Sequence, residues 1–389
     1  MDFLRKACFF SLCTVSPLRV GLLTSLCLLS ACQTGFGSRA VFQRITLEST
    51  LAPSARVELV DVGGHLAPDI VVMTHRPGRL YWFENPTWRN HQVGVTADEF
   101  YGLAVLPKIQ GEAGADLALS GRFSQPGAGT YEQIIWLRNE GRQADENLWT
   151  FRPVRSDIQP GDLFTADMSG TGRRVLGSLP DLAIHSRVRS QRQWVTMPLL
   201  DNPPSNPRVR VFDWDLNGRD DLLVMSDRGL DILALASRGR FVDEFRLFAT
   251  PPGQGFLDVG VGQSGRPARR FIAAISEDGS RLQVFRPDPS SPTGWDARTL
   301  GGALKAARVL KVADLNLDDV DELILGGMDG LFVYYYDREK SVWQRYQIDS
   351  SPVADIAIGD LTGDGFPEMV TTPAEAGVVK LYQNRGRSN

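Results

Sequence analysis

A short acidic pattern in the sequence has the residue types and the spacing of a metal-binding loop. Its clearest copy lies in VFDWDLNGRDDLLV (211–224), where Asp213, Asp215, Asn217 and Asp221 occupy positions 1, 3, 5 and 9. Ca²⁺ takes about six to eight oxygen ligands, which these side chains and a backbone carbonyl at position 7 can supply. The pattern therefore predicts calcium binding. The alternative is an Asx turn, in which Asp and Asn side chains accept backbone hydrogen bonds without a metal.

The same spacing recurs twice toward the C-terminus. The second predicted site consists of Asp314, Asn316, Asp318 and Glu322, and the third consists of Asp360, Thr362, Asp364 and Glu368. Threonine is a weak ligand, and Asp319 stands where the other two loops have glycine, so we expect the sites to differ in strength. An EF-hand would need an acid at position 12 and flanking helices. Position 12 is Val224, Leu325 or Thr371, which excludes an EF-hand.

Four weaker copies extend the series to seven. They begin at Asp61, Pro107, Asp167 and Val261, in a series whose anchors Asp314 and Asp360 are 46 residues apart. Each weaker copy has lost ligand positions, so we do not expect metal at Asp61, Pro107, Asp167 or Gln263. His65 occupies position 5 of the first copy and would be a poor calcium ligand.

Two kinds of β-type segment repeat in step with the loops. Aromatic-containing segments begin at Val41, Trp88, Trp149, Trp194, Phe241, Trp295 and Trp343. Segments rich in β-branched and aromatic residues, such as LYWFEN (80–85) and VKLYQN (379–384), lie between them. Only the third repeat lacks a clear copy, somewhere within residues 184–190. Short strands separated by Gly, Pro and Asp turns, at a period of roughly 50 residues, indicate a strand-based array.

About four strands per repeat, stacked radially, predict an all-β fold: a seven-bladed β-propeller over residues 41–389. The run LLVM (222–225) is apolar on both faces, as a strand between two neighbouring sheets must be. The first repeated element is a lone outer-type strand at residues 41–47, and the last repeat ends without such a strand. We therefore expect the N-terminal strand to close the last blade, which removes an exposed edge. The alternatives are an open solenoid and a ring of six or eight blades.

The loops and strands together resemble the FG-GAP/VCBS repeat family, which includes the propeller of integrin α-subunits. The resemblance rests on the three acidic loops, on the repeat period and on the strand motif LYWFENP (80–86), and it spans roughly residues 41–389. The chain lacks the literal FG and GAP flanks, and four of its seven loops have lost ligands. The resemblance implies Ca²⁺ ions that stiffen the blades rather than take part in chemistry.

The N-terminal segment predicts export. All four cysteines lie within the first 32 residues, so the body of the protein has neither disulfides nor a cysteine metal site. Basic residues precede the apolar run 20–31, which is shorter than the about 20 residues of a membrane span. We therefore assign residues 1–31 to a cleavable signal peptide, with a buried or spanning helix as the alternative.

The end of the apolar run also predicts a lipid anchor. LSAC (29–32) resembles the lipobox of bacterial lipoproteins, which implies lipidation of Cys32. The mostly small and polar residues that follow predict a short flexible tether over 32–40. By the same resemblance, Gln33 after the cysteine favours the outer membrane. The predicted location is therefore the bacterial cell envelope.

The rest of the composition favours a binding protein over an enzyme. The net charge is −4 without a long basic run, which argues against a nucleic-acid partner. The chain has no HExxH, GxSxG, Walker or dinucleotide motif, and its four histidines share no ligand spacing. Five of the eight tryptophans recur at one place in the repeat, which favours packing between strands over sugar stacking. Trp214, inside a loop, is the exception.

We therefore expect a non-catalytic, lipid-anchored envelope propeller that presents a calcium-stiffened surface to a protein or glycan partner. The alternative is a calcium-dependent carbohydrate-active enzyme, a lyase or hydrolase on a propeller scaffold, by analogy with lyases built on related repeats. A third hypothesis is a purely structural lipoprotein that takes part in envelope assembly.

Overall fold

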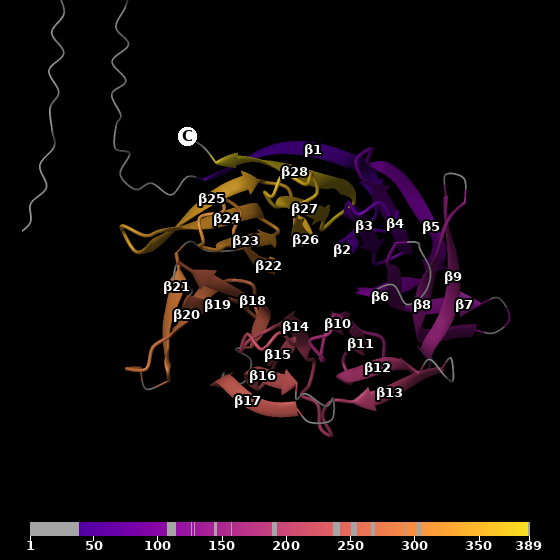
Figure 1. Cartoon of the computed structure of the whole chain (residues 1–389), viewed down its shortest axis with the longest axis horizontal. Helices are drawn as coiled ribbons and strands as arrows, with labels where there is room; N and C mark the ends of the chain where they lie inside the picture. The colour runs from indigo at the N-terminus through magenta and orange to yellow at the C-terminus, as the bar shows by residue number, and fades with distance from the viewer. Residues whose placement is uncertain are drawn as a thin grey trace, which may run out of the picture. The chain divides into compact units, whose positions relative to one another are not determined.

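The computed structural model describes residues 39–387, apart from 107–113, 126, 128, 144–145, 157, 189–192, 236–241, 250–254, 266–268, 292 and 302–304. The predicted signal peptide, the lipidation site Cys32 and most of the tether lie outside the described residues. Within them, no helix is long and apolar enough to cross a membrane. The described residues form 28 strands in seven four-stranded antiparallel sheets (Figure 1).

Six blades are built from four consecutive strands each. Blade 1 has β2 (Ser54–Val60), β3 (Asp69–Thr74), β4 (Gly78–Glu84) and β5 (Arg89–Ala97). Blade 2 has β6 (Glu99–Leu106), β7 (Asp116–Gln125), β8 (Gly129–Gln143) and β9 (Glu146–Ser156). Blade 3 has β10 (Leu163–Ala166), β11 (Val175–Ser178), β12 (Ala183–Val188) and β13 (Gln193–Pro198). The strand that is unclear in the third repeat is therefore β12.

The second half of the ring continues the pattern. Blade 4 has β14 (Arg208–Phe212), β15 (Asp221–Ser226), β16 (Gly229–Leu235) and β17 (Val242–Ala249). Blade 5 has β18 (Phe256–Ser264), β19 (Arg269–Ser276), β20 (Leu282–Pro287) and β21 (Trp295–Leu300). Blade 6 has β22 (Ala307–Ala313), β23 (Glu322–Gly327), β24 (Gly330–Asp337) and β25 (Val342–Asp349). Blade 7 takes β26 (Val353–Gly359), β27 (Glu368–Pro373) and β28 (Gly377–Arg387) from the C-terminal end and β1 (Ala40–Leu51) from the N-terminal end.

The ring closes through β1, as the sequence predicts. β1 pairs antiparallel with β28, with Ile45 opposite Leu381, so the two ends of the propeller share one sheet (Figure 1). The innermost strand of each blade contacts the innermost strand of the next, and β26 returns to β2. The prediction of seven blades is confirmed, and the open solenoid and the rings of six or eight blades are excluded.

The apolar runs form strands because they are covered on both faces. β3, β15 and β23 are buried along their whole length, each lying between two neighbouring sheets. The outermost strands are half-exposed, and their tryptophans pack inward. Trp194, for example, meets Trp136 edge to face at 5.9 Å between ring centroids, in line with the predicted packing role. Trp214 is also half-buried, with its ring 6.3 Å from that of Trp295.

A buried charged cluster reinforces the closure. Asp349, at the end of β25, accepts hydrogen bonds from Lys380 Nζ (3.0 and 3.1 Å) and from Tyr382 Oη (2.9 Å) on β28. Arg44 on β1 donates to the same carboxylate at 3.0 Å. Burial alone would raise the pKa of Asp349, but these bonds and one from the Ser351 N–H outweigh it and hold the pKa well below its usual range. Blade 6 is thereby tied to both chain ends.

We predict that Asp349→Ala lowers the free energy of unfolding by about 3–5 kcal/mol, because it leaves Lys380 buried without its partner. Urea denaturation measures this loss. Because the folded pKa of Asp349 lies below the unfolded one, its stabilisation is present above about pH 4 and is lost as the pH falls through the lowered folded value. The exposed Glu339→Ala on the same blade serves as the control. A loss that stays constant down to pH 2 would contradict the prediction.

Candidate functional site

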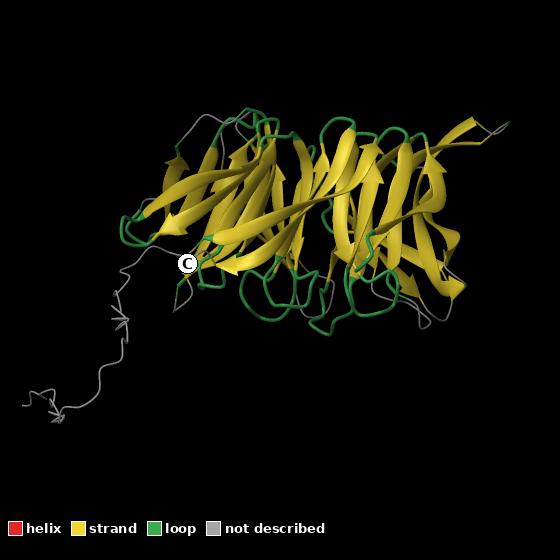
Figure 2. Cartoon of the chain, turned by 90° about the horizontal axis from the view of Figure 1, so that it is seen from above, coloured by secondary structure: helices red, strands yellow, loops and turns green. Residues whose placement is uncertain are grey.

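The acidic loops lie at one rim of the propeller, because each joins the first and second strands of its blade. Figure 2 shows the ring from the side, with the connecting loops gathered at its two rims. The five described loops share one backbone shape. Positions 4 and 6 have positive φ in all of them: Gly64 and Leu66, Gly170 and Gly172, Leu216 and Gly218, Leu317 and Asp319, and Gly363 and Gly365. Asp319 adopts φ 67° in place of the turn glycine, which a short polar side chain tolerates. The Asp314 loop therefore keeps the common shape.

The carboxylate at position 1 holds this backbone shape. Asp213 accepts from the N–H groups of Asn217 (3.1 Å) and Gly218 (2.9 Å). Asp314 and Asp360 accept two backbone N–H groups each in the corresponding way. Asp61 and Asp167, in loops that have lost ligands, do the same. The first residue thus acts as the turn residue of the metal-free alternative in every described loop.

The closing acid at position 9 is buried and returns to the start of its loop. Asp221 accepts from the Trp214 N–H at 2.9 Å, and Glu322 accepts from the Leu315 N–H at 2.7 Å. Glu368 makes the same bond, at 2.7 Å, in the third loop. These three carboxylates are at most 2% exposed. Each loop is therefore closed by a carboxylate before any ion is considered.

The Asp213 loop has the donor set and the spacing for one ion. Carboxylate oxygens of Asp213, Asp215 and Asp221 lie within 4.8 Å of one another. Two oxygens that bind one Ca²⁺ at about 2.3–2.6 Å are at most about 5 Å apart, so this trio fits a shared ion. Asn217 adds an amide, whose Nδ2 donates to Asp215 at 2.8 Å and whose Oδ1 accepts from the Arg219 N–H.

The Asp314 loop concentrates negative charge in a buried place. Burial, with smaller contributions from the neighbouring carboxylates of Asp318 and Asp314, raises the pKa of Glu322 to about 9. Burial likewise raises the pKa of Asp318 and brings that of Asp321 to about 6. The Asn316 amide lies between two of the acids, with Nδ2 3.3 Å from Glu322 and 3.4 Å from Asp318. Asn316 is thus close to two of the predicted acids, whereas the carboxylates of Asp314, Asp318 and Glu322 are not gathered within 4.8 Å as those of the Asp213 loop are. A cation near these acids would lower the repulsion between them.

The Asp360 loop is more open. Thr362 and Asp364 are exposed, and Glu368 is the only fully buried member of its predicted set. Asp364 accepts from the Phe366 N–H at 2.9 Å. Burial raises the pKa of Glu368, and the charges of Asp364 and Asp360 add to that effect.

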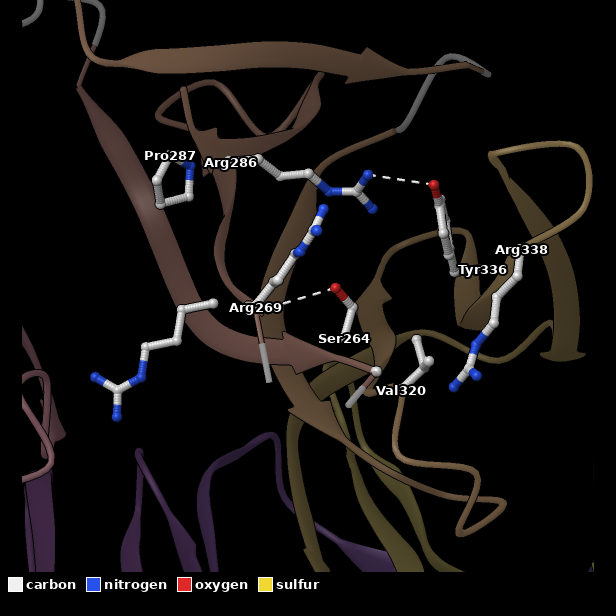
Figure 3. Close-up of a pocket in the computed structure, with 9 residues that line it drawn as sticks. Ser264, Arg269, Arg286, Pro287, Val320, Tyr336 and Arg338 are labelled. Atoms are coloured by element: carbon white, nitrogen blue, oxygen red, sulfur yellow. Dashed lines mark hydrogen bonds between the residues drawn. The ribbon is translucent and has the colours of Figure 1, made fainter. Parts of the chain in front are cut away.

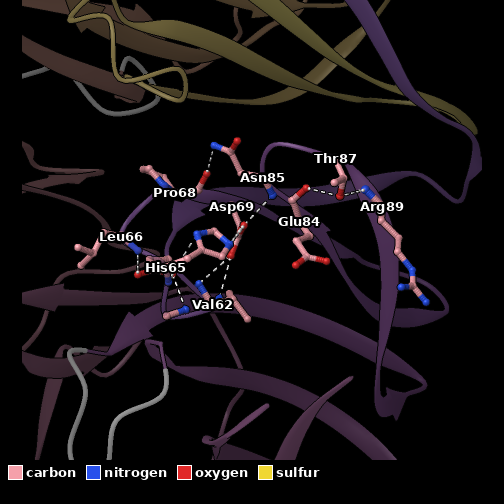
Figure 4. A network of polar contacts seen from close by, with 12 residues as sticks. Val62, His65, Leu66, Pro68, Asp69, Glu84, Asn85, Thr87 and Arg89 are labelled. Atoms are coloured by element: carbon pink, nitrogen blue, oxygen red, sulfur yellow. Dashed lines mark hydrogen bonds and ion pairs between the residues drawn. The ribbon is translucent and has the colours of Figure 1, made fainter. Parts of the chain in front are cut away.

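The first loop gathers a trio that the sequence did not lead us to expect. Nitrogen or oxygen atoms of Asp61, His65 and Asp69 lie within 4.8 Å of one another. The imidazole Nε2 is 3.4 Å from Asp69, whose oxygens also accept the N–H groups of Val62 and Asn85 (Figure 4). The imidazole therefore lies between two carboxylates, and the three side chains are close enough to share one metal ion.

The remaining weak copies are only partly described. The Pro107 loop lies mostly outside the described residues. Gln263, from the fifth copy, donates its N–H to Asp321 at 2.7 Å, and the Gly265 N–H bonds the Asp319 carbonyl at 2.8 Å. The fifth loop thus packs against the Asp314 loop of the next blade.

A repeated asparagine connects each of three loops to the following blade. The Nδ2 groups of Asn85, Asn139 and Asn384 donate to the carbonyls of Leu361, Val62 and Leu315, at 2.7, 2.9 and 2.8 Å. Each acceptor is the second residue of the acidic loop on the preceding blade. The signal is present in the sequence, since each asparagine ends a third-strand motif: LYWFEN, IIWLRN or VKLYQN. We call each of these asparagine–carbonyl contacts an asparagine clamp. From the sequence alone the motifs were interpreted only as strands, and the clamps were missed.

We predict that Asn384→Ala lowers the free energy of unfolding by about 1–3 kcal/mol, because Asn384 is buried and its amide bonds the carbonyls of Leu315 and Pro367. Asn384→Asp isolates the clamp. It keeps the oxygen that accepts the Gly386 N–H but cannot donate. We expect faster hydrogen exchange in the Asp314 loop of both variants. Wild-type stability and exchange in Asn384→Asp would show that the clamp contributes nothing.

Comparison with known proteins supports the fold. No protein-family model and no curated protein matches the sequence. Among solved structures, an Agrocybe aegerita lectin that recognises non-reducing terminal N-acetylglucosamine superposes with a TM-score of 0.52 at 13% identity, covering 84% of this chain and 87% of the lectin. BBS1N, solved in complex with ARL6DN, gives a TM-score of 0.52 at 12% identity, covering 90% of this chain and 100% of BBS1N. The closed ring and these likenesses define the chain as a seven-bladed β-propeller.

Proposed function

We propose that the protein is a non-catalytic, lipid-anchored propeller of the bacterial cell envelope, built from FG-GAP/VCBS-type repeats, that presents a calcium-stiffened rim to a protein or glycan partner. The observation that carries the proposal is the Asp213 loop, whose three carboxylates are close enough to share one ion. The lipid anchor and the envelope location rest on the sequence around Cys32.

Three sets of residues would hold the ions. They are Asp213, Asp215, Asn217 and Asp221; Asp314, Asn316, Asp318 and Glu322; and Asp360, Thr362, Asp364 and Glu368. All are oxygen donors, which suits Ca²⁺ rather than a softer metal. When bound, Ca²⁺ supplies positive charge that neutralises the clustered carboxylates. The chain's own contribution is a loop that is already folded, so the ion would rigidify the rim without rebuilding it.

Rigidity at the rim favours binding because less freedom is lost when a partner associates. The asparagine clamps support this role, since each one holds an acidic loop to the following blade by a hydrogen bond. Two proteins of similar fold have partners of these two classes: the lectin recognises N-acetylglucosamine, and BBS1N was solved in complex with ARL6DN. Either class of partner fits a propeller rim.

Calcium binding predicts a metal-dependent effect of Asp215→Asn, which removes a ligand charge but keeps the side-chain shape. The variant should melt at a lower temperature than wild type in calcium and at nearly the same temperature in chelator. Binding at 100 times the dissociation constant stabilises a protein by about 2.7 kcal/mol, which sets the size of the loss. Asp167→Asn, in a loop that has lost ligands, is the control and should respond alike in both buffers. Equal drops for Asp215→Asn in both buffers would favour the Asx turn.

The binding role predicts a partner that is retained on the protein in the envelope. We expect affinity capture of the full chain from solubilised membranes to recover one defined protein or glycan in calcium, with a several-fold loss in chelator. Mass spectrometry and sugar analysis identify what is bound. Progressive cleavage of a captured glycan would instead support a carbohydrate-active enzyme.

The anchor has its own control in the same experiment. Cys32→Ser should move the protein from the membrane fraction to the soluble fraction, because the acylated thiol is lost. Cys27→Ser, within the predicted signal peptide, should leave the protein in the membrane. Retention of Cys32→Ser in the membrane would contradict the lipidation of Cys32 and leave the partner test intact.

A further inference from the structure

A cleft opens at the same rim between blades 5 and 6. Its volume is about 640 Å³, within the range of ligand pockets. The walls come from the ends of β18, β19 and β20 on one side and from β24 and the Asp314 loop on the other (Figure 3). We call it the arginine cleft, because Arg269, Arg270, Arg286 and Arg338 are among its nine lining residues and no lining residue is acidic.

The charge of Arg286 is incompletely compensated. One terminal nitrogen donates to Tyr336 Oη at 3.2 Å, and the guanidinium lies 4.5 Å from the centre of that ring. The Nε and the other terminal nitrogen are buried without a hydrogen-bond partner. A buried cationic group with open donor positions is costly unless an anion completes it. Figure 3 shows the guanidinium of Arg269 pointing toward that of Arg286, which adds like-charge repulsion.

The two remaining arginines differ in where their charge lies. The Arg270 guanidinium is 5.1 Å from the centre of the Phe212 ring and 5.9 Å from that of Trp214, both on blade 4, so its charge lies on the side of blade 5 that faces away from blade 6. Arg338 donates to the Asp318 carbonyl at 2.7 Å, and its nearest carboxylate oxygen, on Asp318, is 3.8 Å away. Positive charge therefore faces the cleft from both blades.

The shape of the cleft favours a chain of linked groups over one small ion. A second cavity of about 290 Å³ shares Arg286 and Tyr336 with the first and adds Thr299 and the ion pair of Arg298 with Asp296, at 3.0 Å, from β21. Ser264 and Tyr336 bring hydroxyl groups to the first cavity. Arginine forks pair with carboxylates through two parallel hydrogen bonds, and hydroxyl groups suit the hydroxyls of a sugar.

We propose that the arginine cleft binds an acidic glycan, a chain of sugars whose carboxylate groups pair with these arginines. The inference rests on the proposed binding function and specifies one ligand class for it. The arginine side chains supply the positive charge themselves, and strands and the β24–β25 turn hold them in place. Binding of the carboxylates therefore needs no calcium ion as a bridge.

The test is a calorimetric titration of the full chain with a trimer of galacturonic acid in chelator. The chelator removes free calcium, so the glycan carboxylates cannot bind to the acidic loops through a bridging calcium ion. We expect saturable binding that weakens as salt is added, because the contacts are ionic. A neutral galactose trimer should not bind. Inorganic phosphate should bind at least tenfold more weakly than the acidic trimer. Equal binding of the neutral trimer, or no binding of the acidic one, would overturn the proposal, and phosphate binding as tight as the trimer's would replace the glycan with a small oxyanion.

Two variants locate the binding. Arg269→Gln combined with Arg338→Gln changes only exposed side chains and should weaken binding of the acidic trimer about tenfold or more, since hydrogen bonds between charged groups contribute about that factor each. Arg286→Met should abolish saturable binding while the ligand-free variant melts no lower than wild type, because an incompletely paired buried charge has been removed. Arg89→Gln, an exposed arginine at the corresponding turn of blade 1, should bind as wild type does.

Unchanged affinity in the double variant would place the glycan elsewhere and overturn the assignment. Capture of a protein partner from membranes, combined with no binding of the acidic trimer, would refute this inference and leave the proposed function standing.

Discussion

Closure of the ring is the constraint on which the rest of the structure depends. Strands such as β15 and β23 are apolar on both faces, so each blade is stable only between two others. A row of such blades always leaves two unsatisfied ends, and pairing β1 with β28 removes both. The Asp349 cluster then places charge where the two chain ends meet blade 6. A buried charged group there is tolerated because Lys380, Arg44 and Tyr382 all reach it.

The acidic loops serve the fold before they serve any ligand. Asp167 and Asp61 hold their turns with the same backbone bonds as Asp213, although their loops have lost ligands. The two interpretations of the sequence pattern, turn and metal loop, are therefore not exclusive. Position 1 shapes every loop that shares this backbone form, and positions 3 and 5 accept further backbone N–H groups where they carry oxygens, as Asp215 and Asn217 do. Because position 1 is kept in the Asp61 and Asp167 loops, those turns persist although other ligands are lost.

The sequence predicts the fold well because a repeat multiplies a weak signal. One LLVM run does not distinguish a strand from a helix, but seven in phase with turns and aromatic segments do. The register of the blades, the closing strand and the composition of the three acidic loops follow from the same period. His65 shows the limit within one loop, since its position in the pattern does not reveal that the ring turns inward onto Asp69.

Features between blades could not be predicted in the same way. The asparagine clamp joins Asn384 to Leu315, which are 69 residues apart. The strand motifs show that the asparagine repeats, but they do not show which carbonyl on the preceding blade it contacts. The arginine cleft unites β19, β20 and the turn after β24, whose arginines follow no period. Such sites depend on which side chains the packing of adjacent sheets brings together. Such sites can be found only in the three-dimensional structure, even where the fold follows from the sequence.

The distribution of charge distinguishes structural from functional arginines. On the innermost strands, opposite charges are matched across blades: Arg210 lies 2.7 Å from Asp258, and Arg56 pairs with Asp162. Asp258 also accepts the Leu310 N–H at 2.8 Å, which ties blade 5 to blade 6. These charges are satisfied within the ring: the Arg210–Asp258 pair joins the neighbouring blades 4 and 5, and the Arg56–Asp162 pair joins blade 1 to the start of blade 3. In the arginine cleft the matching is incomplete. Arg338 lies 3.8 Å from Asp318, but the Nε and one terminal nitrogen of Arg286 are buried without a hydrogen-bond partner, and no lining residue is acidic. Where the protein supplies both charges, the interaction is part of the fold; at Arg286 the proposed anionic ligand would supply the opposite charge.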